Sequence, residues 1–266
     1  MAPQIDNCHK PSALAVVGNQ YIFALSNYSK SVQMLDISLK SPRWISTNML
    51  VNRQRFGAGV INNCVYVVGG CNSTGFLSSA EAYDVTTRKW QMISGMSTYR
   101  EGLGVGVLNN ILYAVGGFYL GSVLETVECY NPTLDTWSRI ASMYKRRLGA
   151  SVIDLNGILY VIGGHNIKDT LRSVETYNPN EKIWTPVADM HQRRAFAGVF
   201  TFDGLLYVLG GKNTCGVLQS MEIYNPETNT WIMESLSGSD ILLCDGVVVN
   251  KTPNFRANPW SDRYLF

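Results

Sequence analysis

The chain has 266 residues, of which 46% are hydrophobic and 16% charged, and it contains 24 glycines. This composition can bury a large core and supplies many turns, so it excludes an intrinsically disordered chain. The net charge of +2, from 22 basic and 20 acidic residues, offers no overall attraction to nucleic acid or to anionic lipid.

The start of the chain is polar, so residues 1–10 are predicted to be a flexible terminus and residues 11–266 one domain. No apolar stretch resembles a secretory signal, and no run approaches the roughly 18 apolar residues that span a bilayer. The six cysteines have no CxxC spacing, which predicts reduced thiols and neither a disulfide framework nor a metal site. We therefore expect a cytoplasmic protein without cofactors.

The first structural unit is predicted over residues 12–47. Alternating or continuous apolar residues favour strands at Ser12–Val17, Tyr21–Leu25 and Val32–Ile37. This unit lacks the glycine pair found in the later ones, because Leu25-Ser26 occupies that place. It is interpreted as a degenerate copy of the repeat that follows.

Residues 49–231 contain a repeat of 47 residues. Five residue types hold this period independently, which rules out coincidence. They are the glycine pairs that begin at Gly69, Gly116, Gly163 and Gly210; Tyr83, Tyr130, Tyr177 and Tyr224; Trp90, Trp137, Trp184 and Trp231; Met49, Met96, Met143 and Met190; and Arg53, Arg100, Arg147 and Arg194.

Each repeat predicts four short antiparallel strands, as in a β-propeller blade. In the repeat at 149–187, GASVIDL and ILYVIGG flank Asn156-Gly157, a strong hairpin signal, and SVETYNP and IWTPV follow. Small residues on the first strand would let the blades converge on an axis. The glycine pair would allow positive φ and close backbone approach. The blades are predicted at about 55–93, 102–140, 149–187 and 196–233.

The C-terminal unit, about 239–266, departs furthest from the pattern. Ile241–Cys244 and Val247–Val249 around Asp245-Gly246 predict one inner hairpin, but no glycine pair or tyrosine follows. Dividing the chain by the repeat gives about 5.7 units. The sequence thus predicts an all-β propeller of six four-stranded antiparallel blades with degenerate first and last blades, and five blades or an unclosed ring is the alternative.

The order Gly-Gly, then Tyr, then six residues, then Trp resembles the kelch repeat over residues 55–233, and the Met-x-x-x-Arg spacing is similar to that of the kelch-like BTB proteins. That resemblance implies a six-bladed propeller that captures substrates for cullin-RING ubiquitin ligases, or one that binds actin. Cullin would be reached only through a BTB domain, which this chain does not contain.

Candidate binding residues come from the inter-blade loops and the loops after the glycine pairs, where the resemblance places the partner-binding face. Arg53, Arg100, Arg147 and Arg194 would attract acidic side chains. An alternative is that they form structural ion pairs, because Glu81, Glu128, Glu175 and Glu222 recur with the same period.

Residues that do not repeat are better candidates for specificity, since a structural role would repeat. They are Gln54, Arg55, Phe118, Tyr119, His165 and Lys212. Arg55 stands where later repeats have Gly102, Gly149 and Phe196, and Phe118-Tyr119 offers an aromatic surface of the kind found at binding hot spots.

These residues predict a non-enzymatic module that binds a protein target, in particular an acidic peptide segment, as a substrate receptor when joined to a BTB domain. An actin-binding cytoskeletal scaffold is the alternative. A propeller enzyme is the third hypothesis, but no catalytic triad or set of metal ligands can be assembled from the sequence. The sequence does not identify the partner.

Overall fold

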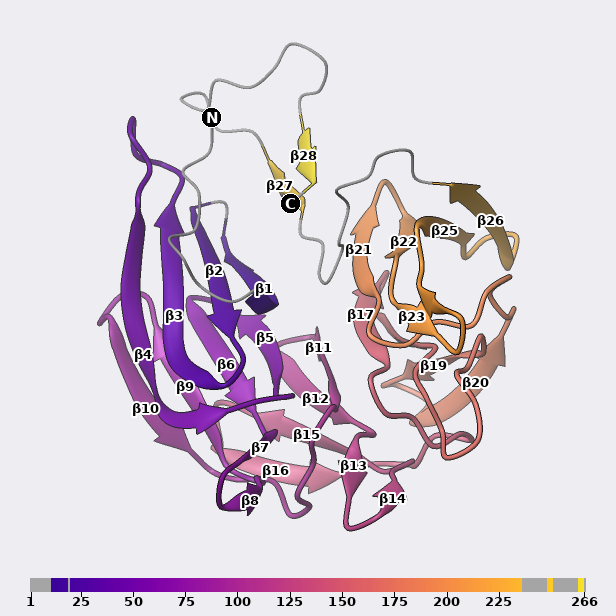
Figure 1. Cartoon of the computed structure of the whole chain (residues 1–266), viewed down its shortest axis with the longest axis horizontal. Coiled ribbons are helices and arrows are strands. Elements are labelled where there is room, and N and C mark those ends of the chain that lie inside the picture. The colour runs from indigo at the N-terminus through magenta and orange to yellow at the C-terminus, as the bar shows by residue number, and fades with distance from the viewer. Residues whose placement is uncertain (1–10, 19, 236–247, 251–262, 266) are drawn as a thin grey trace.

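The computed structural model describes residues 11–18, 20–235, 248–250 and 263–265, and all the regular structure in these ranges is β-strand (Figure 1). Five four-stranded antiparallel sheets follow one another along the chain. The first comprises β1 (Pro11–Val17), β2 (Tyr21–Ser26), β3 (Ser29–Asp36) and β4 (Trp44–Arg53). The degenerate first blade predicted from the sequence is thus a complete sheet, and its last strand runs six residues beyond the predicted end at 47.

The other four sheets repeat one plan, in which the strands pair in chain order. The second contains β5 (Gly57–Ile61), β6 (Cys64–Val68), β9 (Ala80–Asp84) and β10 (Lys89–Ile93). The third contains β11 (Gly104–Leu108), β12 (Ile111–Val115), β15 (Val127–Asn131) and β16 (Thr136–Arg139). The fourth contains β17 (Ser151–Leu155), β18 (Ile158–Ile162), β19 (Val174–Asn178) and β20 (Ile183–Val187). The fifth contains β21 (Gly198–Phe202), β22 (Leu205–Leu209), β25 (Ser220–Asn225) and β26 (Thr230–Ser235).

Three of the loops after the glycine pairs carry a small hairpin that the sequence did not predict. The hairpins are β7 (Cys71–Asn72) with β8 (Gly75–Phe76), β13 (Phe118–Tyr119) with β14 (Ser122–Val123), and β23 (Lys212–Asn213) with β24 (Gly216–Val217). In the fourth blade this loop forms an isolated bridge between His165 and Thr170. In the first blade β2 turns directly into β3, which explains why no glycine pair is present there.

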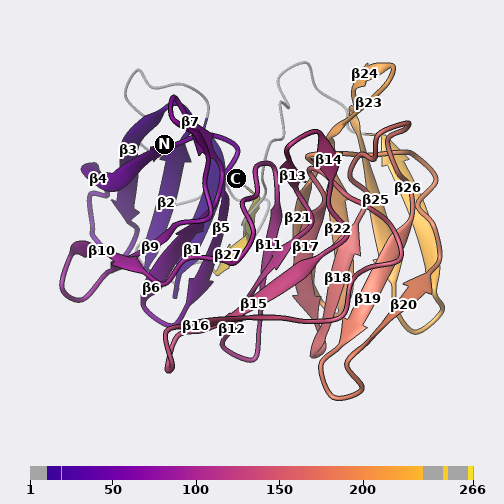
Figure 2. The ribbon, with the colours of Figure 1, turned by 90° about the horizontal axis from the view of Figure 1, so that it is seen from below.

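The blades are arranged in an arc about a common axis (Figures 1 and 2). Their first strands pack side by side in the order β1, β5, β11, β17 and β21. We call the rim formed by the inter-blade loops and the loops after the glycine pairs the loop face. The opposite rim, formed by the turns between the first and second and between the third and fourth strands, is the turn face.

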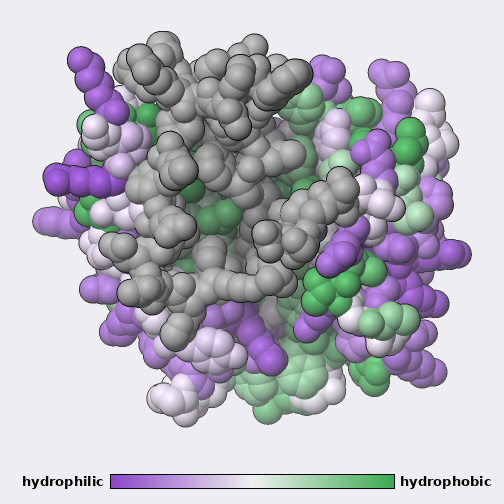
Figure 3. All heavy atoms as spheres, turned by 45° about the horizontal axis from the view of Figure 1, so that its top comes forward, coloured by the Kyte–Doolittle hydropathy of each residue, from purple (hydrophilic) through white to green (hydrophobic). Residues whose placement is uncertain are grey.

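The core lies between blades rather than within one blade. The buried cluster at the first seam joins Phe23 and Val32 of blade 1 to Val65 and Tyr83 of blade 2. Small residues permit this approach: a side chain on Gly57 would collide with Val105 of the next blade. This confirms the predicted role of the small residues on the first strands. On the surface seen in Figure 3, hydrophobic residues are scattered among hydrophilic ones.

The repeated aromatic residues join neighbouring blades, as predicted. Tyr130 lies opposite Trp137 on β15 and β16, with ring centroids 5.2 Å apart, and it also contacts Tyr66 of the preceding blade at 5.9 Å. The indole Nε1 of Trp137 donates to the carbonyl of Ser94, also in the preceding blade, at 2.7 Å. Deleting a buried aromatic side chain of this kind costs about 3–5 kcal/mol, so these contacts are a main source of stability.

The expected sixth blade falls largely outside the described residues. Within them, β27 (Val248–Asn250) pairs antiparallel with β28 (Arg263–Leu265), and Figure 1 places this hairpin between the two ends of the arc. The predicted turn at Asp245-Gly246 and the strand Ile241–Cys244 lie outside the described residues. The described structure therefore contains five complete blades, which is the alternative allowed by the sequence.

Glycine pairs are required at the seams, and this can be tested at Gly116. Gly116 has φ +61°, and a Cβ atom there would collide with the carbonyl oxygen of Arg147. Gly121, at the tip of the β13–β14 hairpin, has φ +81° but no atom within 4 Å of such a Cβ. Left-handed strain alone costs about 1–2 kcal/mol, whereas the collision adds about 1–3 kcal/mol.

We expect Gly116→Ala to lower the free energy of unfolding by about 3 kcal/mol and Gly121→Ala by about 1 kcal/mol. Urea unfolding followed by tryptophan fluorescence measures both. Equal losses for the two variants would contradict the close-approach explanation.

Candidate functional site

The four repeated arginines are buried beneath the loop face. Arg53 has no exposed side-chain surface, and its Nε donates to Glu81 Oε1 at 2.9 Å. Its Nη1 donates to the carbonyls of Gly69 at 2.9 Å and Ser79 at 2.8 Å. The side chain at the end of β4 is thus bonded to three groups in the following blade.

The same network occurs at each later seam. The corresponding pairs are Arg100–Glu128 at 3.0 Å, Arg147–Glu175 at 2.9 Å and Arg194–Glu222 at 3.0 Å. Each glutamate also accepts backbone N–H groups from the loop, as Glu175 does from Tyr144 at 2.7 Å and Lys145 at 3.1 Å. Burial lowers the pKa of all four guanidinium groups, and the paired glutamates oppose that effect.

This geometry corrects one prediction. The buried ion pairs match the structural alternative, and Arg53, Arg100, Arg147 and Arg194 are 0–1% exposed. They cannot contact a partner on the surface of this structure, so we remove them from the set of candidate binding residues. Their repetition reflects the architecture of the seams.

Adjacent arginines in one loop allow the structural role to be measured. Arg147 is buried with Glu175, whereas the neighbouring Arg146 pairs with Glu125 with about half of its side chain exposed. Removing one partner of a buried pair costs about 3–5 kcal/mol, and an exposed pair contributes at most about 1 kcal/mol. We expect Arg147→Ala to destabilise the fold by the larger amount and Arg146→Ala by the smaller. Chemical denaturation distinguishes them, and similar effects would refute the assignment.

The buried pairs also make stability depend on pH. Burial by itself would raise the pKa of Glu128, but hydrogen bonds from Ser97 and Arg100 outweigh burial, so the pKa lies below its usual value of 4.5. Because the folded-state pKa is the lower one, the carboxylate stabilises the fold fully above about pH 4.5. That stabilisation is lost as the pH falls through the folded-state pKa.

We therefore expect the difference in unfolding free energy between the wild type and Glu128→Gln to be large at pH 7 and to shrink between pH 4.5 and pH 3. Urea titrations at several pH values measure it, with the exposed Glu227→Gln as the control. A difference that stays constant from pH 7 to pH 3 would argue against the linkage.

A backbone ladder near the axis brings Arg55 to the loop face. The N–H of Gly102 donates to the carbonyl of Arg55, Gly149 donates to Gly102, and Phe196 donates to Gly149, each at 2.7–2.8 Å. All four residues have left-handed φ between +52° and +64°. Glycine suits this conformation, whereas Arg55 and Phe196 adopt it at a conformational cost. The side chain of Arg55 is 56% exposed and pairs with Glu101 at 3.0 Å.

Aromatic side chains from blades 2 and 3 gather on the loop face. Phe118 and Tyr119 of β13 contact Phe76 of β8, with ring centroids 6.1 and 5.5 Å apart. Tyr99 of the inter-blade loop stacks on Tyr119 at 5.3 Å. We call these four residues the aromatic cluster. The structure thus adds Phe76 and Tyr99 to the two residues singled out in the sequence.

The remaining candidate binding residues also lie on the loop face, but they do not form one site. Gln54 is half-buried and bridges Cys71, and His165 is half-buried beside Thr170, with the ring Nδ1 3.4 Å from Thr170 Oγ1. Lys212 is exposed, with its Nζ 4.8 Å from the ring centroid of Phe196.

The loop face carries several large hydrophobic side chains that are exposed. They are Tyr99, Leu120, Tyr144, Ile167, Phe196 and Val217, together with Tyr28 in the corresponding β2–β3 turn of blade 1. Between them lie the exposed Lys145, Lys168 and Lys212, none within 4 Å of a carboxylate in the part of the chain described. The sequence did not single out most of these residues. Departure from the repeat could have indicated some of them, since Tyr99 and Tyr119 stand where other repeats have Arg146 and Asn166.

The chain belongs to the kelch-repeat family. The kelch motif matches residues 52–97, 99–144, 146–191 and 193–235, which together make up more than half of the sequence. Kelch-repeat domains are generally protein-interaction modules, and most of them are binding domains rather than enzymes.

Relatives match only parts of the chain. Kelch repeat protein C2 of Vaccinia virus (strain Western Reserve) is 25% identical over 96 residues, which cover 36% of this chain and 17% of that protein. Kelch-like protein 41a of Danio rerio is 48% identical over 46 residues, covering 17% of this chain and 8% of that protein. The matched segments are thus less than a fifth of the relatives' length.

The fold is also similar to a solved structure. The structure of YjhT covers 87% of this chain with a TM-score of 0.76, at 16% sequence identity and over 85% of its own length. This likeness concerns the fold alone. Among the described residues there is no helix long and apolar enough to cross a membrane, and no group of three His, Cys, Asp or Glu side chains placed to hold a metal ion.

Proposed function

We propose that the loop face binds a segment of another protein that combines an apolar anchor with acidic residues. The observation that carries this proposal is the set of exposed hydrophobic side chains on the loop face, interspersed with lysines that form no ion pair among the described residues. Exposed apolar patches on a rigid domain favour a protein partner, and aromatic residues are frequent hot spots.

The charge of the loop face favours an acidic partner. On the loop face Arg146, Arg172 and Arg193 are balanced by Glu125, Asp189 and Asp169, but Lys145, Lys168 and Lys212 have no such partners among the described residues. The excess is therefore positive, and acidic residues would be attracted and oriented by it. A rigid blade scaffold lowers the entropic cost of binding a flexible segment.

We further propose that the module serves in the cytoplasm as a substrate receptor of a cullin-RING ubiquitin ligase when it is joined to a BTB domain. The support is the similarity of its repeats to those of kelch-like proteins. In this role the loop face would hold the substrate, and the BTB domain would supply the contact with cullin.

The aromatic cluster gives the sharpest test. The residues at the position of Tyr119 in blades 2, 4 and 5 are Asn72, Asn166 and Asn213, whose side chains accept backbone N–H groups two residues further on. Tyr119→Asn therefore introduces the residue that the repeat itself uses, and it should preserve the fold while removing the centre of the cluster.

A partner is first captured from cell lysate with the wild-type chain, and its affinity is then measured with purified components. Loss of a hot-spot aromatic should weaken binding about thirtyfold or more, corresponding to at least about 2 kcal/mol. The control is Leu134→Asn, which changes an exposed leucine on the turn face and should leave the affinity unchanged. A partner that binds Tyr119→Asn as tightly as the wild type would contradict the proposal, and filamentous actin behaving in this way would favour the scaffold alternative.

A further inference from the structure

Two turns on the turn face, at Arg88 in blade 2 and Lys182 in blade 4, carry a basic residue where blades 3 and 5 have Asp135 and Asn229. In each of blades 2 to 5 the residue two positions before the repeated tryptophan has left-handed φ: +55° at Arg88, +49° at Asp135, +58° at Lys182 and +53° at Asn229. Asn and Asp tolerate this conformation better than other residues with a side chain. Arg88 therefore occupies a position that the backbone would fill more readily with Asn or Asp.

In blades 3 and 5 this residue closes the seam to the preceding blade. Asp135 Oδ1 accepts from the hydroxyl of Tyr130 at 2.7 Å and from the N–H of Ser94, in the preceding blade, at 2.9 Å. Asn229 Oδ1 accepts from Tyr224 at 2.8 Å and from the N–H of Ala188 at 2.9 Å. A guanidinium group has no acceptor and cannot replace these bonds.

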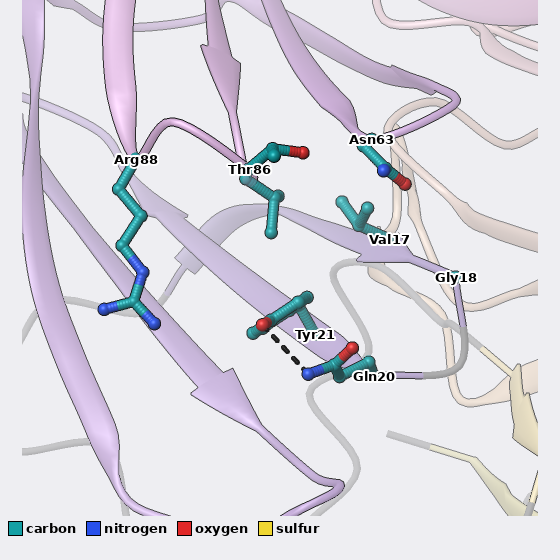
Figure 4. A pocket seen from close by; sticks show the side chains of 8 residues that line it. Val17, Gly18, Gln20, Tyr21, Asn63, Thr86 and Arg88 are labelled. Atoms are coloured by element: carbon teal, nitrogen blue, oxygen red, sulfur yellow. Dashed lines mark hydrogen bonds between the residues drawn. The ribbon is translucent and has the colours of Figure 1, made fainter.

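At the seam between blades 1 and 2, Arg88 instead lines a cleft of about 410 Å³. Figure 4 shows Arg88 on one side of the cleft and Asn63 on the other, with Thr86 between them and Tyr21 and Gln20 lower in the view. Val17, Gly18, Val85 and Thr86 complete the lining. Arg88 is exposed, and within the described ranges it makes no ion pair and no hydrogen bond.

Carboxylates close to the cleft already have donors of their own. Asp36 accepts from Gln20 Nε2 at 3.3 Å and from the hydroxyl of Ser38 at 2.6 Å. Asp84 accepts the backbone N–H groups of Thr86 at 2.7 Å and Thr87 at 3.3 Å. Neither lies within 4 Å of the guanidinium group of Arg88, which leaves that group open to a ligand.

We propose that this cleft binds a small polar organic anion through a phosphate or carboxylate group held by Arg88. A guanidinium group matches both of these oxyanions with two parallel hydrogen bonds. The amide of Asn63 and the hydroxyl of Tyr21 are positioned to bind the polar remainder of the ligand. The volume lies within the range of small-molecule sites, about 300–1,000 Å³, and exceeds what a bare oxyanion needs.

This site is independent of the loop face. Its residues lie on the opposite rim and contribute nothing to the aromatic cluster, so it does not rest on the proposed binding of a protein segment. Either site can be disproved while the other stands.

The test uses the full chain and two defined probes, glycerol 3-phosphate and glycerate, which share a small polar body and differ in the oxyanion. Binding is followed by isothermal titration calorimetry at constant ionic strength, with glycerol as the uncharged control. We expect at least one of the two anions to bind with a millimolar or lower dissociation constant, and which one binds identifies the oxyanion.

Arg88→Asn is the decisive variant, because Asn is the residue of blade 5 and suits the left-handed backbone. This variant should fold, and its affinity for the anion should be at least about tenfold lower, because a charge-assisted hydrogen-bonded pair is lost. Lys182→Asn, the same change at the equivalent position of blade 4, is the matched control and should leave binding within twofold. Absence of binding by the wild type, equal binding of glycerol, or unchanged binding by Arg88→Asn would each overturn the proposal.

Discussion

The structure depends on one repeated interaction, the buried arginine that joins consecutive blades. The carbonyl oxygen of Arg100 accepts the N–H of Gly70 from blade 2, while its guanidinium group binds the carbonyls of Gly116 and Thr126 and the carboxylate of Glu128 in blade 3. One residue therefore satisfies polar groups of two blades in a site that excludes water. A buried charge is tolerated only when it is paired, which is why the arginine and the glutamate recur together. Among the described residues, Arg100 Nε is nevertheless a buried nitrogen without a hydrogen-bond partner.

The glycine pair is a consequence of the same interaction. At Gly69 a Cβ atom would lie 2.6 Å from the carbonyl oxygen of Arg100, so a side chain at this position would push the seam apart. Blade 1 has no glycine pair, because β2 turns directly into β3 through Asn27 and Tyr28. The absence of the motif there reflects a shorter loop, and the sheet itself is complete.

Residues that depart from the repeat carry the functional proposals. Tyr119 replaces a turn asparagine, Arg55 and Phe196 occupy positions where the middle blades have glycine, and Arg88 replaces a residue that seals a seam in blades 3 and 5. Tyr119 and Arg88 give up hydrogen bonds that other blades make at the same positions, and Arg55 and Phe196 adopt a left-handed backbone at a conformational cost. The binding roles proposed above would account for such losses, since strained or locally unfavourable residues tend to gather at functional sites.

The sequence was sufficient to predict the β-propeller class, the strands of the regular blades and the pairing of the repeated Arg and Glu as one of two interpretations. It could do so because a 47-residue period places identical side chains in identical environments. It could not decide whether the arginines face solvent, because a charged residue in a loop is usually exposed and only the packing of the next blade buries it. Tertiary structure was needed to bring Tyr99 and Phe76 to Tyr119, and to place Arg88 of blade 2 in one cleft with Tyr21 of blade 1, since these arrangements join different loops and blades whose spacing depends on how the sheets pack.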